Sequence, residues 1–209
     1  MKLSRILIIL GAIALVFFIA SFALFSPQKT PDIKNFPSQG TDIIAFGDSL
    51  VSGTGSTAGH DFVSLLSQKI GRPIVNLGHP GDTTADGLAR IDEIDRYHPK
   101  VVLVLLGGND RLHNVAPDKT FGNLGTIIAH IESKGGIVLL LGIRGGIVSD
   151  PYAPRFEALA SAYRTAYISD VLKNLFADQK FMSDAVHPND AGYAHISDRV
   201  YPVLKPLLQ

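Results

Sequence analysis

The stretch Asp42-Ile43-Ile44-Ala45-Phe46-Gly47-Asp48-Ser49 decides how the rest of this chain is interpreted. Its apolar run, bounded by polar and glycine residues, predicts a buried strand of a parallel sheet over Asp42–Phe46. Ser49 lies just past the end of that strand. Because ligands of open α/β sheets bind outside the carboxyl ends of the strands, this serine can present its hydroxyl to a substrate. A Gly-Asp-Ser sequence taken alone is also typical of an ordinary turn of small residues.

Downstream, short apolar runs alternate with helical patterns, which predicts βα units and a parallel sheet. We expect strands at Asp42–Phe46, Pro73–Leu77, Val101–Leu106, Ile137–Gly142 and Ala166–Ser169. Apolar residues at helical spacing predict helices at Asp61–Ile70, Thr84–Tyr97, Phe121–Ile131, Phe156–Tyr163 and Tyr193–Val200. The apolar stripes of these helices are expected to face the sheet.

The first 25 residues form a separate segment by composition. Lys2 and Arg5 precede Ile6–Phe25, which carries no charge. As a helix, this run is about 30 Å long, which matches the hydrocarbon core of a bilayer. Its length, and a poor cleavage motif at Ser21-Phe22-Ala23, favour an uncleaved anchor over a signal peptide. The positive charges before it predict that the rest of the chain is exported. It is then anchored to the cytoplasmic membrane with the domain outside, or it is periplasmic or secreted if the segment is cleaved.

Residues 26–40 contain three prolines and little periodicity, which predicts a linker between residues 1–25 and a single domain over residues 41–209. The absence of cysteine excludes disulfides and thiolate nucleophiles, and suits an exported fold that relies on core packing. Basic and acidic residues are equal in number, at 19 each, and no basic cluster with interleaved aromatic residues is present. We therefore expect no nucleic-acid partner.

Polar groups suited to one type of chemistry follow the predicted strands. Ser49, Gly81 and Asn109 come after the first, second and third strands, and right-handed crossovers place them at one edge of the sheet. Asp184 and His187 precede the last predicted helix, in an expected irregular turn beside that edge.

Together these residues provide what acyl transfer to serine requires. Ser49 can attack, His187 can act as general base and then general acid, and Asp184 can orient the imidazole. The backbone N–H groups of Ser49 and Gly81 and the side-chain amide of Asn109 can donate hydrogen bonds to the oxyanion.

Four blocks resemble, in order and spacing, the SGNH (GDSL) hydrolase superfamily, and most closely its bacterial thioesterase, lysophospholipase and arylesterase branch. The blocks are Gly47-Asp48-Ser49-Leu50, Gly81-Asp82-Thr83, Gly107-Gly108-Asn109-Asp110 and Asp184-Ala185-Val186-His187-Pro188. The resemblance extends from about Thr41 to the end of the chain.

The resemblance implies an α/β fold, namely a three-layer α/β/α sandwich with a flavodoxin-like five-stranded parallel sheet, here preceded by the N-terminal hydrophobic helix. It implies catalytic roles for Ser49, Asp184 and His187, and oxyanion-hole roles for Ser49, Gly81 and Asn109. It implies no metal and no cofactor.

We therefore expect an exported serine esterase that hydrolyses carboxylic esters or thioesters of small to medium acyl groups through an acyl-enzyme on Ser49. Two alternatives stay open: an O-acetylesterase acting on cell-envelope glycans, and a catalytically silent module that binds glycan or lipid. The expected partners are a small-molecule ester or lipid substrate and, through the N-terminal helix, the membrane.

The sequence leaves the substrate-binding residues unassigned and the oligomeric state open. Arg144–Pro154 and Val171–Met182 carry no informative pattern. Apolar residues before Asp184 are compatible either with an acyl groove or with packing at the sheet edge; they are Leu172, Leu175, Phe176, Phe181 and Met182.

Overall fold

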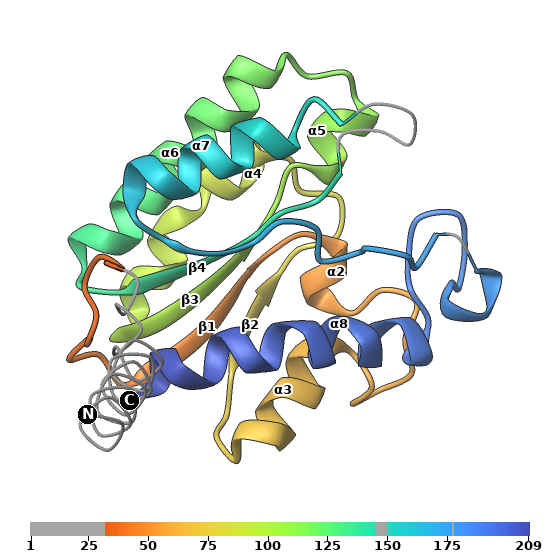
Figure 1. Ribbon diagram of the computed structural model, residues 1–209, viewed down its shortest axis with the longest axis horizontal. Helices are drawn as coiled ribbons and strands as arrows, with labels where there is room; N and C mark the ends of the chain where they lie inside the picture. Colours follow the sequence, from red (N-terminus) through yellow and green to blue (C-terminus); the bar gives the residue numbers. More distant parts are fainter. Residues whose placement is uncertain (1–31, 145–149, 177) are drawn as a thin grey trace, which may run out of the picture. The chain divides into compact units, whose positions relative to one another are not determined.

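Five strands form one parallel sheet in the order β2-β1-β3-β4-β5 (Figure 1). They are β1 Asp42–Gly47, β2 Val75–Gly78, β3 Pro99–Leu105, β4 Ile137–Leu141 and β5 Ala166–Ile168. The strand order is that of flavodoxin-like sheets, in which the chain reverses direction across the sheet after β2. All five predicted strands are present, with ends displaced by one or two residues.

Helices cover both faces of this sheet. Helices α4, α6 and α7 lie on one side, and α3 and α8 lie on the other (Figure 1). The helices are α2 Ser49–Ser52, α3 Phe62–Ile70, α4 Thr84–Ala89, α5 Gly108–Leu112, α6 Pro117–Ser133, α7 Ala153–Tyr163 and α8 Asp190–Leu204, with 3₁₀ helices η1 Ile91–Arg96, η2 Gln179–Phe181 and η3 Lys205–Leu208. The predicted five-stranded parallel sheet with flanking helices is confirmed.

The computed structural model describes residues 32–144, 150–176 and 178–209. The predicted N-terminal hydrophobic helix, within residues 1–25, lies outside the described residues. In the part of the chain that is described, no helix combines the length and the apolar character needed to cross a membrane.

The predicted helix Thr84–Tyr97 is in fact two helices, α4 and η1. The break lies at Arg90, whose backbone has φ −116° and ψ 21°. The side chain of Arg90 donates to the carbonyl oxygen of Gly47 at the end of β1 instead of lying along a continuous helix surface. A non-helical backbone at this position therefore accompanies a long-range contact.

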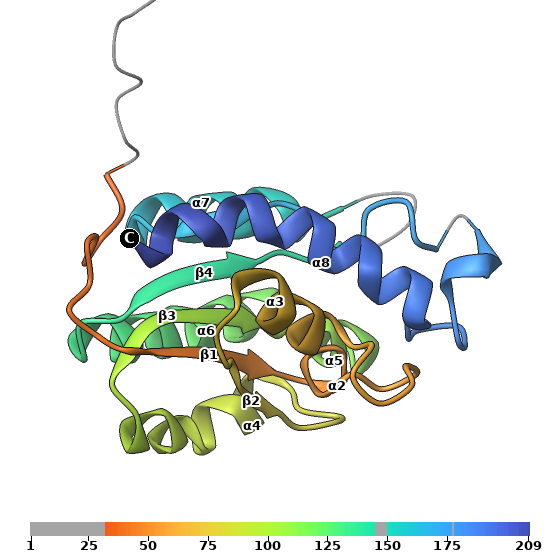
Figure 2. The ribbon, with the colours of Figure 1, turned by 90° about the horizontal axis from the view of Figure 1, so that it is seen from below.

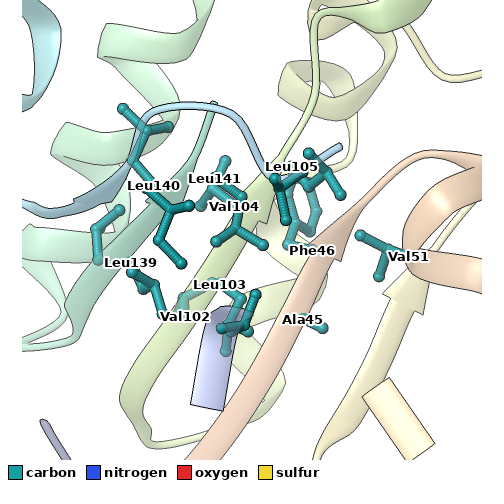
Figure 3. Packing of buried hydrophobic residues seen from close by; sticks show 14 of the residues in the cluster. Ala45, Phe46, Val51, Val102, Leu103, Val104, Leu105, Leu139, Leu140 and Leu141 are labelled. Atoms are coloured by element: carbon teal, nitrogen blue, oxygen red, sulfur yellow. The ribbon is translucent and has the colours of Figure 1, made fainter. Parts of the chain in front are cut away.

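The core is centred on β1, β3 and β4. Figure 3 shows Phe46, Val104 and Leu140 among its side chains, and each is at most 1% exposed. Burial of one such side chain contributes about 1.5–3 kcal/mol, before the entropy cost of ordering it. The centre of the sheet is thus a rigid base for the loops that leave the carboxyl ends of its strands.

The second half of the predicted linker contacts the domain. Residues 32–40 belong to the compact unit that spans Asp32–Gln209. The side-chain amide of Asn35 donates to the carbonyl oxygens of Glu132 and Gly136, at 2.8 and 3.0 Å. These contacts satisfy carbonyl groups near the end of α6, so this segment is part of the packed fold and is not a free spacer.

Candidate active site

Ser49 is the first residue of α2, directly beyond the end of β1. The side chain of Asp48 caps this short helix by accepting a hydrogen bond from Leu50 N at 3.0 Å. Gly47 allows the strand end to approach its neighbour, because a Cβ at this position would lie 2.2 Å from the carbonyl oxygen of Leu105. The turn therefore holds the serine at the carboxyl edge of the sheet.

Three of the predicted site residues form a continuous hydrogen-bonded chain. His187 Nε2 lies 3.0 Å from Ser49 Oγ, and His187 Nδ1 lies 2.8 Å from Asp184 Oδ2. The hydrogen bond with the imidazole, followed by bonds from the backbone N–H groups of His187 and Val186, lowers the pKa of Asp184 to about 2. An ionised Asp184 can only accept, so we assign the imidazole proton to Nδ1, which leaves Nε2 to accept from the serine hydroxyl.

The turn that carries Asp184 and His187 is irregular, as predicted, and is organised by its own backbone bonds. Asp184 Oδ1 accepts from the backbone N–H groups of Val186 and His187, at 2.7 and 2.8 Å. Ser183 N donates to the carbonyl oxygen of His187 at 2.8 Å. The side chain of Asp184 is nevertheless 55% exposed.

A glycine loop lies against this turn, and sequence reasoning did not detect its role. Gly55 has φ +95°, and a Cβ there would lie 2.6 Å from the carbonyl oxygen of Pro188 and 3.1 Å from the Cβ of His187. Thr57 donates from both its backbone N and Oγ1 to the carboxylate of Asp190, each at 2.7 Å. The Gly-Thr-Gly-Ser pattern at residues 53–56 is the sequence feature that indicates this contact, since small residues permit two backbone segments to approach closely.

The predicted oxyanion donors lie in the segments that follow β1, β2 and β3. Gly81 has φ +90°, a left-handed conformation that suits glycine. Among the described residues, its N–H donates no hydrogen bond. Asn109 Nδ2 donates to the carbonyl oxygen of Asp82 at 2.9 Å, which orients the amide and leaves its second N–H. Figures 1 and 2 show α2 and α5, the helices that contain Ser49 and Asn109, at the same end of the sheet.

A buried carboxylate connects the Asn109 turn to the start of α4. Asp110 is fully buried, and it accepts from the backbone N and Oγ1 of Thr84, at 2.7 and 2.5 Å. Thr120 Oγ1 donates to the same carboxylate at 3.1 Å. Asp48 and Asp110 thus both accept from backbone N–H groups, those of Leu50 and Thr84, and nothing in the sequence indicated the threonine partners of Asp110.

Asp48 is a second buried carboxyl beside the nucleophile, with 3% of the residue exposed. Burial raises its pKa to about 7, and the neighbouring Asp82 adds to the increase. The hydrogen bond from Leu50 N and the nearby His187 act in the opposite direction. The nucleophile is thus adjacent to a carboxyl group that titrates close to neutral pH.

The apolar residues before Asp184 divide between the two interpretations given above. Leu172 and Leu175 are buried in the core, which supports packing at the sheet edge. Phe181 packs edge-on against the ring of His195, with centroids 4.4 Å apart. Phe176 is 53% exposed.

Across the described part of the chain, no group of three His, Cys, Asp or Glu residues has the arrangement needed to hold a metal ion.

Known proteins match this chain over the segment that carries these residues. The family described as the GDSL-like Lipase/Acylhydrolase family matches residues 45–195. Esterase TesA of Pseudomonas aeruginosa is 32% identical over 181 residues, which cover 79% of this chain and 89% of that protein. Thioesterase 1/protease 1/lysophospholipase L1 of Escherichia coli K12 is 29% identical over 175 residues, covering 79% of this chain and 84% of that protein.

Similarity of fold accompanies similarity of sequence. The crystal structure of TesA superposes with a TM-score of 0.76 at 30% identity, over 80% of this chain and 100% of that chain. The family match includes the blocks around Ser49, Gly81, Asn109 and His187. The chain therefore belongs to the GDSL-like lipase/acylhydrolase family and is an ester-hydrolysing serine hydrolase.

Proposed function

We propose that this hydrolase acts on carboxylic esters or thioesters of small to medium acyl groups through an acyl-enzyme on Ser49. The observation that carries the proposal is the 3.0 Å contact between His187 Nε2 and Ser49 Oγ, two atoms from residues 138 positions apart. A base within hydrogen-bond reach of a hydroxyl can remove its proton as the oxygen attacks. The ionised Asp184 holds the imidazole in the required tautomer and stabilises it once it is protonated.

The reaction proceeds in two stages. Ser49 Oγ attacks the acyl carbon while its proton passes to His187 Nε2, and the carbonyl oxygen becomes an oxyanion. The N–H groups of Ser49 and Gly81 and the Asn109 amide stabilise that oxygen. His187 then gives the proton to the departing alcohol or thiol, and the acyl-enzyme remains. Water, deprotonated by His187, attacks the acyl-enzyme in the same way and releases the acid and Ser49.

Exposed apolar side chains near the site support an acyl substrate. Leu112, in the helix of Asn109, is 59% exposed, and Val186, beside His187, is 38% exposed. Two of the related proteins bear the names esterase and thioesterase/lysophospholipase, which supports both ester and thioester substrates. Acylated glycans stay an alternative substrate class; an assay panel of acyl p-nitrophenyl esters, acyl thioesters and acetylated glycans distinguishes it.

The proposal includes export. The uncharged run Ile6–Phe25 after Lys2 and Arg5 supports an N-terminal anchor, followed by a linker and the hydrolase domain. Fractionation of cells that express the full chain, with the length of the mature protein measured, separates an anchored form from a cleaved one.

Active-site labelling tests the mechanism. A fluorophosphonate should label the wild type, and Ser49→Ala should prevent both labelling and turnover. His187→Ala should lower kcat by on the order of 10⁴-fold or more, because the base and the acid are lost together. Ser133→Ala is the matched control, since the hydroxyl of Ser133 donates to the carbonyl oxygen of His130 at 2.7 Å in the exposed part of α6. Labelling or undiminished turnover in Ser49→Ala would contradict the proposal.

A further inference from the structure

Arg90 connects the loop after β2 to the end of β1. Its Nη2 donates to the carbonyl oxygen of Gly47 at 2.9 Å, and its Nε donates to Asp82 Oδ2 at 2.6 Å. A third bond runs from Nη1 to Glu93 Oε2 at 3.0 Å. The side chain is only 13% exposed, so these bonds are largely shielded from water. One side chain therefore spans two of the blocks that surround the nucleophile.

The contacts of Arg90 continue to the Asn109 amide. Gly47 is two residues before Ser49, and Asp82 directly follows Gly81. While the carboxylate of Asp82 binds Arg90, its backbone carbonyl oxygen accepts from Asn109 Nδ2 at 2.9 Å. The Ser49 turn, the Gly81-Asp82 loop and the Asn109 turn are thus joined through Arg90 and Asp82.

We propose that Arg90 is a positioning residue for ester hydrolysis, which fixes the Gly81-Asp82 loop relative to the Ser49 turn so that the oxyanion donors are in place when charge develops. It acts through Gly47 and Asp82. The inference rests on the proposed oxyanion hole. Preorganised donors are effective because they need not reorient during the reaction, and a misplacement of about 1 Å can cost roughly 10²-fold in rate.

The geometry requires an arginine at this position. The guanidinium carbon lies 4.3 Å from the centroid of the fully buried Phe46 ring, so the plane of the group is held against the end of β1. The planar fork then directs separate N–H groups to a carbonyl and to two carboxylates at once. A lysine ammonium supplies the charge but not this simultaneous arrangement.

The carboxylates of Asp82 and Glu93 also depend on Arg90. Their side chains are 14% and 20% exposed, and both bind the one guanidinium. Without Arg90, two partly buried negative charges would lose their shared counterion, and the buried Asp48 already experiences the charge of Asp82. We expect the Asp82 side chain to turn toward solvent and carry the Gly81 loop with it.

The test compares Arg90→Gln and Arg90→Lys with the matched control Arg72→Gln. Arg72 Nη2 donates to the carbonyl oxygen of Thr41 at 2.8 Å, just before β1, so it makes the same type of contact at the other end of the strand. With p-nitrophenyl butyrate, Arg90→Gln should lower kcat by about 10–100-fold and change KM by less than about threefold. Arg90→Lys should recover little of this loss, and Arg72→Gln should keep kcat within about twofold.

A transition-state analogue separates positioning from general loss of stability. Phenylboronic acid forms a tetrahedral adduct with a catalytic serine, and one boronate oxygen occupies the oxyanion position. Its inhibition constant should rise in parallel with the loss of kcat/KM in Arg90→Gln and stay unchanged in Arg72→Gln. If Arg90→Gln fails to fold, Arg90→Lys and Asp82→Asn serve instead. Because both changes weaken the same contact, the variant that combines Arg90→Lys with Asp82→Asn should lose no more kcat than the more impaired of the two single variants.

The inference would be overturned if kcat of Arg90→Gln were within about twofold of the wild type, or if Arg90→Gln and Arg72→Gln lost kcat equally. A fall in kcat with unchanged boronate affinity would also overturn it, since the oxyanion site would then be intact. Failure of the proposed function itself has a different signature, which is an active Ser49→Ala variant.

Discussion

The two halves of the active site are held in different ways. The oxyanion half is held by buried or largely buried residues, although Gly81 itself is exposed: Asp110 is fully buried, Asp48 is 3% exposed, and the side chains of Arg90 and Asp82, which bind each other, are 13% and 14% exposed. The acid–base half is an irregular turn at the surface, where the side chain of Asp184 is 55% exposed. Hydrogen bonds between distant segments position the oxyanion half. The acid–base half is positioned mainly by hydrogen bonds within residues 181–189.

This difference matches what each half must do. Oxyanion donors are effective when they are fixed before the charge appears, and this favours donors that buried residues hold in place. The imidazole exchanges protons with the serine, the leaving group and water, and a water-accessible turn permits that exchange. We therefore expect loss of an oxyanion donor to be costly in turnover, and substitution of the exposed carboxylate of Asp184 to be milder.

The largest effect expected from this comparison is that of Asn109→Ala. Loss of the amide removes one oxyanion donor and the bond to the Asp82 carbonyl, so kcat should fall by about 10²–10³-fold with little change in KM. Asn35→Ala is the matched control, because its amide also donates to backbone carbonyls, but near the end of α6. Steady-state kinetics measure both. A loss of less than about tenfold in Asn109→Ala would remove the amide from the oxyanion hole.

Asp184→Asn should have a smaller effect and leave measurable turnover, well short of the roughly 10⁴-fold loss of kcat that the same change causes at a buried triad aspartate. The asparagine keeps an oxygen for the backbone N–H groups of Val186 and His187 but turns an N–H₂ group toward Nδ1. That favours the tautomer in which Nε2 carries the proton and cannot accept from Ser49, although water at this exposed position permits partial recovery. Asp178→Asn, at another exposed carboxylate, should leave kcat unchanged. Equal activities of the two variants would contradict the role of Asp184.

The parts of the fold that depend on local pattern were predictable from the sequence. Buried parallel strands are continuous apolar runs, so β1 to β5 were placed to within one or two residues. The order of strands and crossovers then brought Ser49, Gly81 and Asn109 to one edge. The pairing of Asp184 with His187 follows from their short separation in an irregular turn.

Features that depend on long-range contacts were not predictable. Leu88, Ile91 and Ile94 keep helical spacing through Arg90, so periodicity alone cannot reveal the break between α4 and η1. The bonds from Thr84 to Asp110 join residues 26 positions apart, and no local signal marks a threonine for such a partner. A contact of this type is determined by the packing of whole elements.

Asp48→Asn should have the smallest effect on turnover, and its signature is the pH dependence of stability. The folded-state pKa of Asp48 is about 7 and the ordinary value is 3.8, so the folded protein binds more protons than the unfolded chain between these pH values. The free energy of unfolding contributed by this group therefore falls as pH rises through that window, by up to about 1.4 kcal/mol per pH unit. Asp184 has the opposite sign, because its lowered pKa gives stability that is lost only as pH falls toward 2.

Urea unfolding at pH 5 and pH 8 measures the effect. Asparagine at position 48 is nearly isosteric, keeps an oxygen that can accept from Leu50 N, and has no charge to desolvate at high pH. Its variant should lose less stability than the wild type between pH 5 and pH 8, by on the order of a few kcal/mol. Asp86→Asn, at a surface carboxylate with a lowered pKa, should keep the slope of the wild type over this range. If stability falls between pH 5 and pH 8 as much in Asp48→Asn as in the wild type, burial does not disfavour the charged form of Asp48. The difference between the two halves of the site would then not include the ionisation of this carboxyl.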